Sequence, residues 1–558
     1  MNTITSTKNK QLIVSILTLL ITACGGGSSS SSPAEDRPNI IFVLTDDQRW
    51  DTVADMAYVN EIFKQKGAYF TNAYVTDPEC CPARATILSG GYYPENTGVL
   101  ENNAKNGSIS HFNENDTLAT NLKELGYNTG FIGKYLHGYK KGHVPPGWTV
   151  FISNAEGGQV LDWYNYGPYT IGSSGQNTEA ILEQDKSHLT VSQKARAFDA
   201  LENLSNSSKP FFLMISTFSP HPPSTPEPQD ENYYTDFFYN DRAVNESDLS
   251  DKPSWVTTGP LNAGGCGNKN PQKQLRAIRS LDRLMEELDS NLVRLGLQDN
   301  TIVIFSSDNG VLWGEHGLCD KGWAYEESVR VPLLIKGPGV ITQTLEDLIA
   351  MNLDIPQTIL EIAGYKFTGD GVSLKNLLFK GQPITRKHIS IQNYGYTSYR
   401  FDTDGIWRGI IYKDSDNFLK YVMHSTGEQE LYDLLEDPYE KESLHETSPI
   451  KFSNLKELVF ENNGLVITSS SIPNAIASKY YSYKLTHWGS ITTGMVRWNL
   501  RSGRLPEGIT LDTTSGEISG ISTEVGEYEV DMEIISDIKG SQSKRVKSYS
   551  RKYTFSVL

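Results

Sequence analysis

Two pairs of polar residues stand where short apolar runs end, and their side chains could bind a metal ion. The pairs are Asp46 with Asp47, and Asp308 with Asn309. Because ligands of open α/β sheets gather outside the carboxyl ends of the strands, we expect both pairs to reach one site. Three carboxylates and one amide oxygen form a hard-oxygen set that suits Ca²⁺, with Mg²⁺ as second choice, and does not suit zinc. Either pair alone would ordinarily form only a turn.

Two adjacent cysteines, Cys80 and Cys81, need a chemical explanation. The chain has five cysteines, and their spacing predicts neither a CxxC zinc site nor a disulfide framework. A helix that begins near Pro82 would place partial positive charge beside this pair. The alternative is that both cysteines are buried structural thiols.

The run from Cys80 to Gly90 resembles the signature of the sulfatase family, Cys-x-Pro-x-Arg followed by small residues and glycine. Only Cys80 has proline two positions later and arginine, Arg84, four positions later. The resemblance implies that a separate maturation enzyme oxidises Cys80 to formylglycine. One hydroxyl of the hydrated aldehyde then attacks sulfur, and the other ejects sulfate, which an ordinary serine could not do. Arg84 is expected to orient this gem-diol.

The same resemblance implies the ligands of the metal ion. In the family, motifs like the two acidic pairs bind a metal that also binds the formylglycine and a sulfate oxygen. The implied set is Asp46, Asp47, Cys80, Asp308 and Asn309.

Three further residues match family positions that act on the sulfate ester. Lys134 lies in a block that reads Gly-Lys-Tyr-Leu-His, and Lys321 matches the sulfate-binding lysine of the family. His221 matches the histidine that protonates the leaving alcohol. Together with Arg84, the two lysines would supply a local positive field that stabilises charge on the transferring sulfuryl group.

Two more histidines are candidate substrate contacts. His137 stands one position later than the family histidine of the same block, and it either contacts sulfate or is structural. His316 is close enough to Lys321 in sequence to line the pocket, and a structural role is the equal alternative.

Apolar runs alternate with amphipathic segments, which predicts an α/β domain with a mixed, mostly parallel sheet. The expected strands are 40–44, 211–217, 301–305 and 331–335, and the expected helices are 118–125 and 275–295. The resemblance implies an alkaline-phosphatase-like sheet between helices.

The predicted sulfatase domain covers residues 37–460, divided into a large α/β part (37–374) and a small α+β subdomain (375–460). Residues 461–558 lack helical periodicity, and alternation at 528–534 predicts a half-exposed strand. Their turn pattern resembles the Ig-like modules of bacterial surface proteins, so we expect an appended β-sandwich.

The N-terminus reads as an export signal. Two lysines precede an apolar run at residues 12–21, and Cys24 follows Thr-Ala as in a bacterial lipobox. Residues 1–24 are therefore predicted as a lipoprotein signal peptide, Cys24 as the lipidation site and 25–36 as a Gly/Ser tether. An exported protein held to a bacterial membrane by a lipid, in the periplasm or at the cell surface, is expected. An ordinary signal peptide is the alternative.

The formal net charge of −17 argues against a nucleic-acid partner. It also means that an anionic substrate needs a locally positive pocket. The predicted function is hydrolysis of sulfate esters on a polysaccharide or oligosaccharide, such as ulvan, carrageenan or a glycosaminoglycan. Two alternatives stay open, namely a phosphonate monoester or phosphodiester hydrolase of the same superfamily, and a non-catalytic glycan-binding protein.

Overall fold

The computed structural model describes a large part of the chain. It covers residues 37–558 except 103–106, 155–161, 165, 167, 175–180, 240–242, 245, 259–265, 267–270, 367–368, 395–405, 449–454, 457, 460–465, 468, 470, 489–495 and 537–546. The predicted signal peptide, the tether and Cys24 lie outside the described residues. Within the described residues, no helix is both long enough and apolar enough to cross a membrane.

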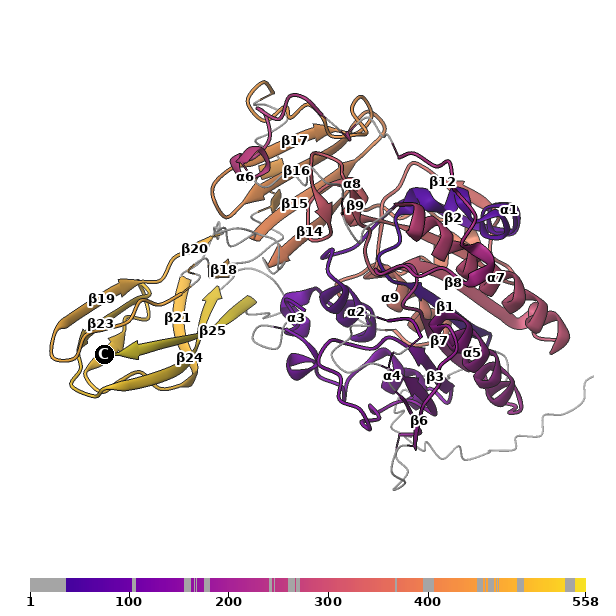
Figure 1. Ribbon diagram of the computed structural model, residues 1–558, viewed down its shortest axis with the longest axis horizontal. Helices are drawn as coiled ribbons and strands as arrows, with labels where there is room; N and C mark the ends of the chain where they lie inside the picture. The colour runs from indigo at the N-terminus through magenta and orange to yellow at the C-terminus, as the bar shows by residue number, and fades with distance from the viewer. Residues whose placement is uncertain are drawn as a thin grey trace, which may run out of the picture.

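A large mixed sheet forms the centre of the protein (Figure 1). Its parallel core has the strand order β8 (Thr301–Ser307), β1 (Asn39–Thr45), β7 (Phe211–Ser216), β3 (Asn128–Gly133) and β4 (Val150–Ser153). The predicted mixed sheet is therefore confirmed. One predicted strand, β11 (Arg330–Lys336), runs antiparallel to both of its neighbours, β8 and β2 (Gly67–Tyr74). The edges carry β12 (Gln343–Leu345), β13 (Ala350–Met351), β5 (Tyr169–Gly172) and β6 (Ile181–Glu183).

Helices cover both faces of the sheet, which explains why its strands are continuous apolar runs. Ile40, Phe42 and Leu44 of β1 pack in one buried cluster, and Ile41 and Val43 pack in another on the opposite face. The first cluster includes α2 (Cys80–Leu88), α4 (Leu118–Glu124), α9 (Asp354–Ile362) and α10 (Lys375–Lys380). The second includes α1 (Ala57–Lys66), α5 (Leu189–Ser205) and α7 (Pro271–Arg294).

Short elements lie in the connections around the sheet. The helices are α3 (Pro94–Thr97), α6 (Ser254–Thr258) and α8 (Glu326–Val329), with 3-10 turns η2 (Trp50–Asp55), η3 (Ile109–His111), η5 (Pro228–Asp230) and η6 (Gln298–Asn300). Two strands of two residues each, β9 (Leu312–Trp313) and β10 (Cys319–Asp320), pair antiparallel in a short hairpin.

A smaller antiparallel sheet follows in the chain and lies beside the large one (Figure 1, orange). It contains β14 (His388–Tyr394), β15 (Ile406–Lys413), β16 (Phe418–His424) and β17 (Gln429–Asp433), each paired with the next. Its apolar side packs with Trp323, Tyr325 and Val329 of the large domain.

The C-terminal segment forms a separate β-sandwich (Figure 1, yellow). One sheet contains β19 (Tyr480–Lys484), β23 (Glu517–Ile521) and β22 (Ile509–Leu511). The other contains β21 (Val496–Gly503), β24 (Gly526–Ser536) and β25 (Lys547–Val557), and β18 (Val466–Ile467) pairs with β20 (His487–Trp488). The strand expected at 528–534 is confirmed as part of β24.

The sandwich is not detached from the rest of the protein. Its buried apolar cluster also includes Leu100, Tyr394 and Ile406, which belong to the preceding part of the chain. Burial of these three side chains ties the module to β14, to β15 and to the segment that follows α3.

Candidate functional site

The two acidic pairs meet because the strands that carry them are neighbours. β1 and β8 run parallel with Thr45 opposite Ser307, so the residues that follow both strands emerge at the same edge. The backbone N–H of Asp47 donates to Asp308 Oδ1 at 3.1 Å, and Asn309 Nδ2 donates to Asp47 Oδ1 at 2.7 Å. Both pairs are fully buried.

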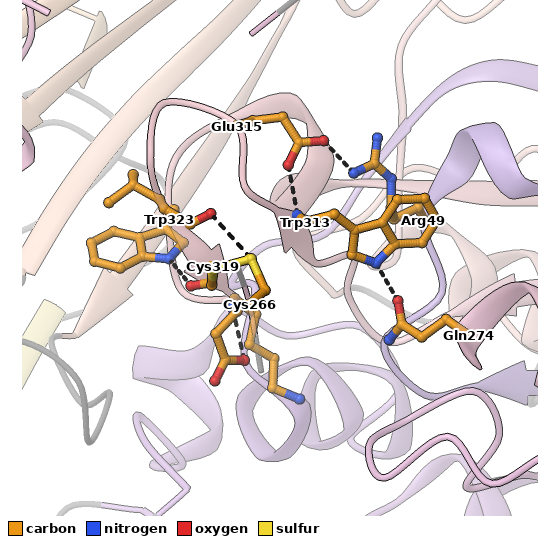
Figure 2. Close-up of a disulfide and its surroundings, with 10 residues drawn as sticks. Arg49, Cys266, Gln274, Trp313, Glu315, Cys319 and Trp323 are labelled. Carbon is orange, nitrogen blue, oxygen red and sulfur yellow. Dashed lines mark hydrogen bonds and ion pairs between the residues drawn. A yellow bond between two sulfur atoms is a disulfide. The ribbon is translucent and has the colours of Figure 1, made fainter. Parts of the chain in front are cut away.

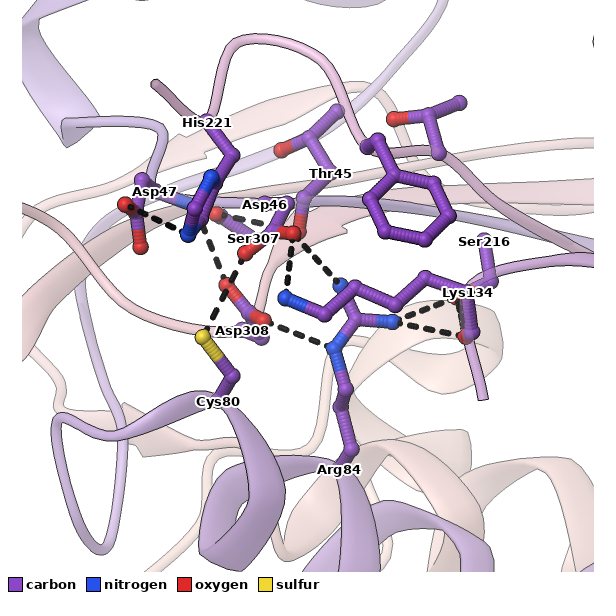
Figure 3. A network of polar contacts seen from close by, with 12 residues as sticks. Thr45, Asp46, Asp47, Cys80, Arg84, Lys134, Ser216, His221, Ser307 and Asp308 are labelled. Carbon is purple, nitrogen blue, oxygen red and sulfur yellow. Dashed lines mark hydrogen bonds and ion pairs between the residues drawn. The ribbon is translucent and has the colours of Figure 1, made fainter. Parts of the chain in front are cut away.

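Cys80 is the first residue of α2, so the helix begins two positions earlier than Pro82. Its thiol donates to Asp46 Oδ1 at 3.5 Å (Figure 3). It also lies 2.6 Å from Lys321 Nζ. The N-terminal end of α2 adds partial positive charge at this position. Burial raises the pKa of the Cys80 thiol well above its usual range. An unmodified Cys80 is therefore not the thiolate that cysteine nucleophiles require.

Three cations surround the acidic groups. Arg84, one turn after Cys80, donates from Nε to Asp308 Oδ2 at 2.8 Å (Figure 3). Lys134, which directly follows β3, places Nζ 2.5 Å from Asp46 Oδ2. Lys321 Nζ is in close contact with Asp47 Oδ1. Positive and negative charges are thus paired inside a buried site of an acidic protein, as burial of charge requires.

These pairings determine the protonation of the carboxylates. Burial alone would raise the pKa of Asp46, but Lys134, His221 and Arg84 hold it well below the usual range. Burial and the charge on Asp46 together raise the pKa of Asp308 to about 6, against the opposing effect of Arg84, Lys134 and Lys321. Asp46 is consequently the more firmly ionised of the two groups.

The site offers donor atoms for a divalent cation. One ligand atom from each of Asp46, Asp47, Cys80 and His221 lies within 4.8 Å of the other three. Asn309 Oδ1 is buried at the same edge and has no hydrogen-bond partner among the described residues, as expected of an atom that a cation would bind. Asp308 lies beside this group, with its oxygens accepting from Asp47 N and Arg84 Nε. The donor set fits a hard cation.

His221 follows β7 and points its ring into the site (Figure 3). Its Nδ1 lies 2.6 Å from the carbonyl oxygen of Pro222, so Nδ1 carries the proton that this hydrogen bond needs. Nε2 faces the site at 3.7 Å from Asp47 Oδ2. Burial lowers the pKa of His221 to about 4, against the opposing effect of Asp46 and Asp47.

The other two histidines have different surroundings. His137 is buried, and its Nε2 has no hydrogen-bond partner among the described residues. Burial, together with the charges of Lys134 and Lys321, lowers the pKa of His137 well below the usual range. His316 is fully buried, stacks on Tyr325 with ring centroids 4.1 Å apart and lies 2.8 Å from Glu246. Within the described residues, no hydrogen bond or ion pair joins His316 to the cluster around Cys80.

Ser216, the last residue of β7, is a site residue that our sequence reasoning missed. Its hydroxyl donates to the Lys134 carbonyl at 2.6 Å and accepts from Arg84 Nη1 at 2.5 Å. It therefore holds a lysine and an arginine of the site in place at once. Its position at the carboxyl end of a predicted strand is the signal that could have identified it.

The expectation on the cysteines was incomplete, because Cys266 and Cys319 form a disulfide (Figure 2). The two residues are 53 positions apart, and only the fold brings them together. Cys319 lies in β10, two residues before Lys321. The other described cysteines, Cys80 and Cys81, are free and buried.

Three family models match this chain. The Sulfatase model matches residues 38–365, and the model for the C-terminal part of N-sulphoglucosamine sulphohydrolase matches residues 314–460. The He_PIG model, which describes an Ig domain, matches residues 464–557.

Curated relatives are similar over much of the chain. Human (Homo sapiens) N-acetylglucosamine-6-sulfatase is 32% identical over 383 residues, which cover 64% of this chain and 68% of that protein. The extracellular sulfatase SULF-1 homolog of Drosophila melanogaster is 32% identical over 349 residues. That match covers 60% of this chain but only 30% of the length of the fly protein.

Solved structures share the fold. A protein in complex with its substrate D-glucosamine-2-N,6-O-disulfate gives a TM-score of 0.65 at 23% identity, covering 76% of this chain and 97% of that one. The phosphonate monoester hydrolase of Agrobacterium radiobacter gives 0.57 at 20% identity, covering 76% and 95%. These likenesses agree with the architecture described above.

Proposed function

Because this chain belongs to the sulfatase family, a family of sulfuric ester hydrolases, we propose that it hydrolyses sulfate esters of a sulfated glycan. The observation that carries this proposal is the position of Cys80. Its sulfur lies at the start of α2 between an Asp46 carboxylate and the Lys321 ammonium. Converted to formylglycine, residue 80 supplies a hydrated aldehyde that can accept a sulfuryl group on one hydroxyl and release sulfate through the other.

We propose Ca²⁺ as the metal. It would neutralise negative charge on a sulfate oxygen and on the side chain of residue 80. Asp46, Asp47, Asp308 and Asn309 would hold it. The unpartnered Oδ1 of Asn309 and the predominance of oxygen donors support this assignment over zinc.

The cations of the site would bind and activate the sulfate group. Lys134 and Lys321 approach the site from different elements, and each is already oriented by a buried carboxylate. Arg84 is held by Asp308 and Ser216, so its guanidinium needs no reorganisation when charge develops on the sulfuryl oxygens. Their combined field would draw an anion into a protein whose overall charge is negative.

His221 would protonate the leaving alcohol through Nε2, because Nδ1 is held by the Pro222 carbonyl. This role needs the doubly protonated ring, and the anionic sulfate ester bound beside it would raise the pKa of His221 from its substrate-free value of about 4. His221→Ala is expected to lower kcat/KM by about 10²-fold on a sugar sulfate. The loss should be much smaller on 4-nitrophenyl sulfate, because nitrophenolate leaves without a proton. The measurement is the ratio of the two losses in steady-state assays.

His188→Ala provides the matched control, because His188 is also a buried histidine but bonds to the Thr225 carbonyl, away from Cys80. We expect it to affect both substrates equally or not at all. Equal losses on both substrates in His221→Ala would contradict the general-acid role.

We propose a sulfated polysaccharide or oligosaccharide as the substrate, and the names of the relatives favour a sulfated amino sugar as the unit. Ion chromatography of sulfate released from a panel of 6-O-sulfated glucosamine derivatives, ulvan and carrageenan fragments would test this. A phosphonate monoester in the same panel tests the alternative hydrolase, whose solved member shares the fold.

Export, lipid attachment at Cys24 and maturation by a formylglycine-generating enzyme complete the proposal. The Cys266–Cys319 disulfide supports export, since such bonds persist in oxidising compartments. Mass spectrometry of the Cys80 peptide, after co-expression with the maturation enzyme, is the direct test. An unmodified thiol would instead favour the glycan-binding alternative.

The C-terminal sandwich is expected to stabilise the enzyme and not to take part in the reaction. Deleting residues 461–558 should leave hydrolysis of 4-nitrophenyl sulfate largely unchanged at low temperature. It should lower Tm, because Leu100, Tyr394 and Ile406 lose their apolar cover. Parallel kinetic and calorimetric measurements would check both statements, and a folded but inactive truncation would show that the module shapes the site.

A further inference from the structure

The Cys266–Cys319 disulfide (Figure 2) crosslinks the chain two residues before Lys321. Cys319 is the first residue of β10, which pairs with β9 through only two residue pairs. Lys321 follows directly after β10, and its ammonium contacts Asp47 and the sulfur of Cys80. A crosslink two residues away can therefore control where this ammonium lies.

The backbone around Lys321 is irregular, so regular secondary structure does little to hold it. Asp320 has a φ of 74° and Gly322 a φ of 83°, both in the left-handed region. Lys321 N donates to Asp320 Oδ1 at 2.9 Å, and Gly322 N donates to the Pro78 carbonyl at 3.1 Å. A lysine side chain loses about 2 kcal/mol of rotamer entropy when it is fixed, so its placement depends on a well-positioned backbone.

The hairpin is fastened to the large domain on its other side as well (Figure 2). Trp313 Nε1 donates to Gln274 of α7, and Trp313 N donates to Glu315 Oε2 at 2.6 Å. Glu315 in turn pairs with Arg49, two residues after Asp47, at 2.5 Å. These contacts hold β9. The disulfide, together with the hydrogen bond that Trp323 Nε1 donates to the Cys319 carbonyl at 2.8 Å, holds β10, the strand that leads into Lys321.

We propose that the Cys266–Cys319 disulfide is a positioning element of the active site, which keeps the Lys321 ammonium on Asp47 and residue 80. The inference rests on the role of Lys321 in the proposed function. Reduction by a dithiol converts both sulfurs to thiols and oxidises the dithiol to its own disulfide. Sulfatase activity is then lowered reversibly, through the placement of Lys321 and not through unfolding.

A double-mutant cycle separates positioning from general stabilisation. The double variant Cys266→Ala/Cys319→Ala should lower kcat/KM on 4-nitrophenyl sulfate about tenfold. An effect of this size lies within the usual range of interaction energies between neighbouring residues. In the Lys321→Ala background, the same pair of substitutions should cause no further loss. In the Lys134→Ala background the full tenfold loss should remain, because Lys134 follows β3 and is not attached to the hairpin.

Because the Lys321→Ala and Lys134→Ala variants are expected to turn over slowly, their rates are measured under single-turnover conditions. Mass spectrometry verifies that every protein has the same formylglycine content. If the cysteine variant does not fold, dithiothreitol treatment of the folded native enzyme replaces it. Activity should then fall and return on reoxidation, with an unchanged circular dichroism spectrum.

The outcomes distinguish the inference from the function on which it rests. Full activity in Lys321→Ala would overturn the proposed role of that lysine. An inactive Lys321→Ala, combined with a cysteine variant that is fully active or equally impaired in every background, would overturn only the positioning role of the disulfide.

Discussion

Cys80→Ala is expected to abolish turnover, lowering kcat by about 10⁴-fold or more, as loss of a covalent nucleophile does in other enzymes. Residue 80 lies between the Asp46 carboxylate and the Lys321 ammonium, and we expect no other described side chain to replace it there. Cys80→Ser should be equally inactive in a host that matures only cysteine, since a serine hydroxyl cannot release the sulfate ester by elimination. Stopped or continuous assays with 4-nitrophenyl sulfate measure both variants.

Cys81→Ala is the matched control for this experiment. Cys81 is buried like Cys80 and belongs to the same helix, but its thiol has a hydrogen bond with the backbone of His137, and its backbone N–H donates to Asn102 Oδ1 at 2.9 Å. We expect an active enzyme of somewhat lower stability, because only a small side chain is truncated. If Cys81→Ala were inactive and Cys80→Ala active, the nucleophile would be Cys81 and our assignment of Cys80 would be wrong.

Asp308→Ala is expected to lose bound metal and activity together, with a fall in kcat/KM of about 10³-fold. The substitution removes a carboxylate that accepts from Asp47 N and pairs with Arg84 at 2.8 Å. Because the Arg84 charge would stay buried without its partner, stability should fall by about 3–5 kcal/mol as well. Elemental analysis of gel-filtered protein, followed by Ca²⁺ titration of the activity, measures the metal directly.

A second buried carboxylate separates the loss of metal from the loss of stability. Asp354 is fully buried and pairs with Arg386 at 2.5 Å, in contacts like those of Asp308 with Arg84. Asp354→Ala should cost similar stability but retain metal and activity at low temperature. Metal retained in chelator-washed Asp308→Ala, or lost equally from both variants, would contradict the assignment of Asp308.

Much of the site could be predicted from the sequence because its residues stand in local patterns. An apolar run followed by two polar residues marks the end of a buried strand, and this is where Asp46, Asp47, Asp308 and Asn309 are found. Cys80 and Arg84 lie one helical turn apart, a spacing that a helix beginning at the cysteine brings to one face. These relations depend on short-range geometry, so they can be recognised without the fold.

Other features depend on which distant segments meet, and no local pattern encodes that. β11 is a buried apolar run like the parallel strands of the sheet, and only its pairing with β2 and β8 makes it antiparallel. His316 was expected at the site because it is close to Lys321 in sequence, yet its ring packs on Tyr325 and lies beside Glu246. A strand or loop residue is assigned to a site by its neighbours in space, and some of these, such as β2 beside β11, lie far away along the chain.

From the sequence by itself came the nucleophile candidate, the acidic pairs at the strand ends and the order of the α/β, α+β and Ig-like parts. Hydrophobic periodicity and turn residues, which act over a few positions, predicted the strands and the acidic pairs. The nucleophile and the Ig-like module were predicted from short motifs that resemble known families. Only the tertiary structure decided that Cys266 pairs with Cys319, that Ser216 holds both Arg84 and Lys134, and that the sandwich packs on Leu100 and Tyr394. Those contacts join segments whose separation along the chain is large, so packing of the whole fold selects them and no short stretch of sequence does.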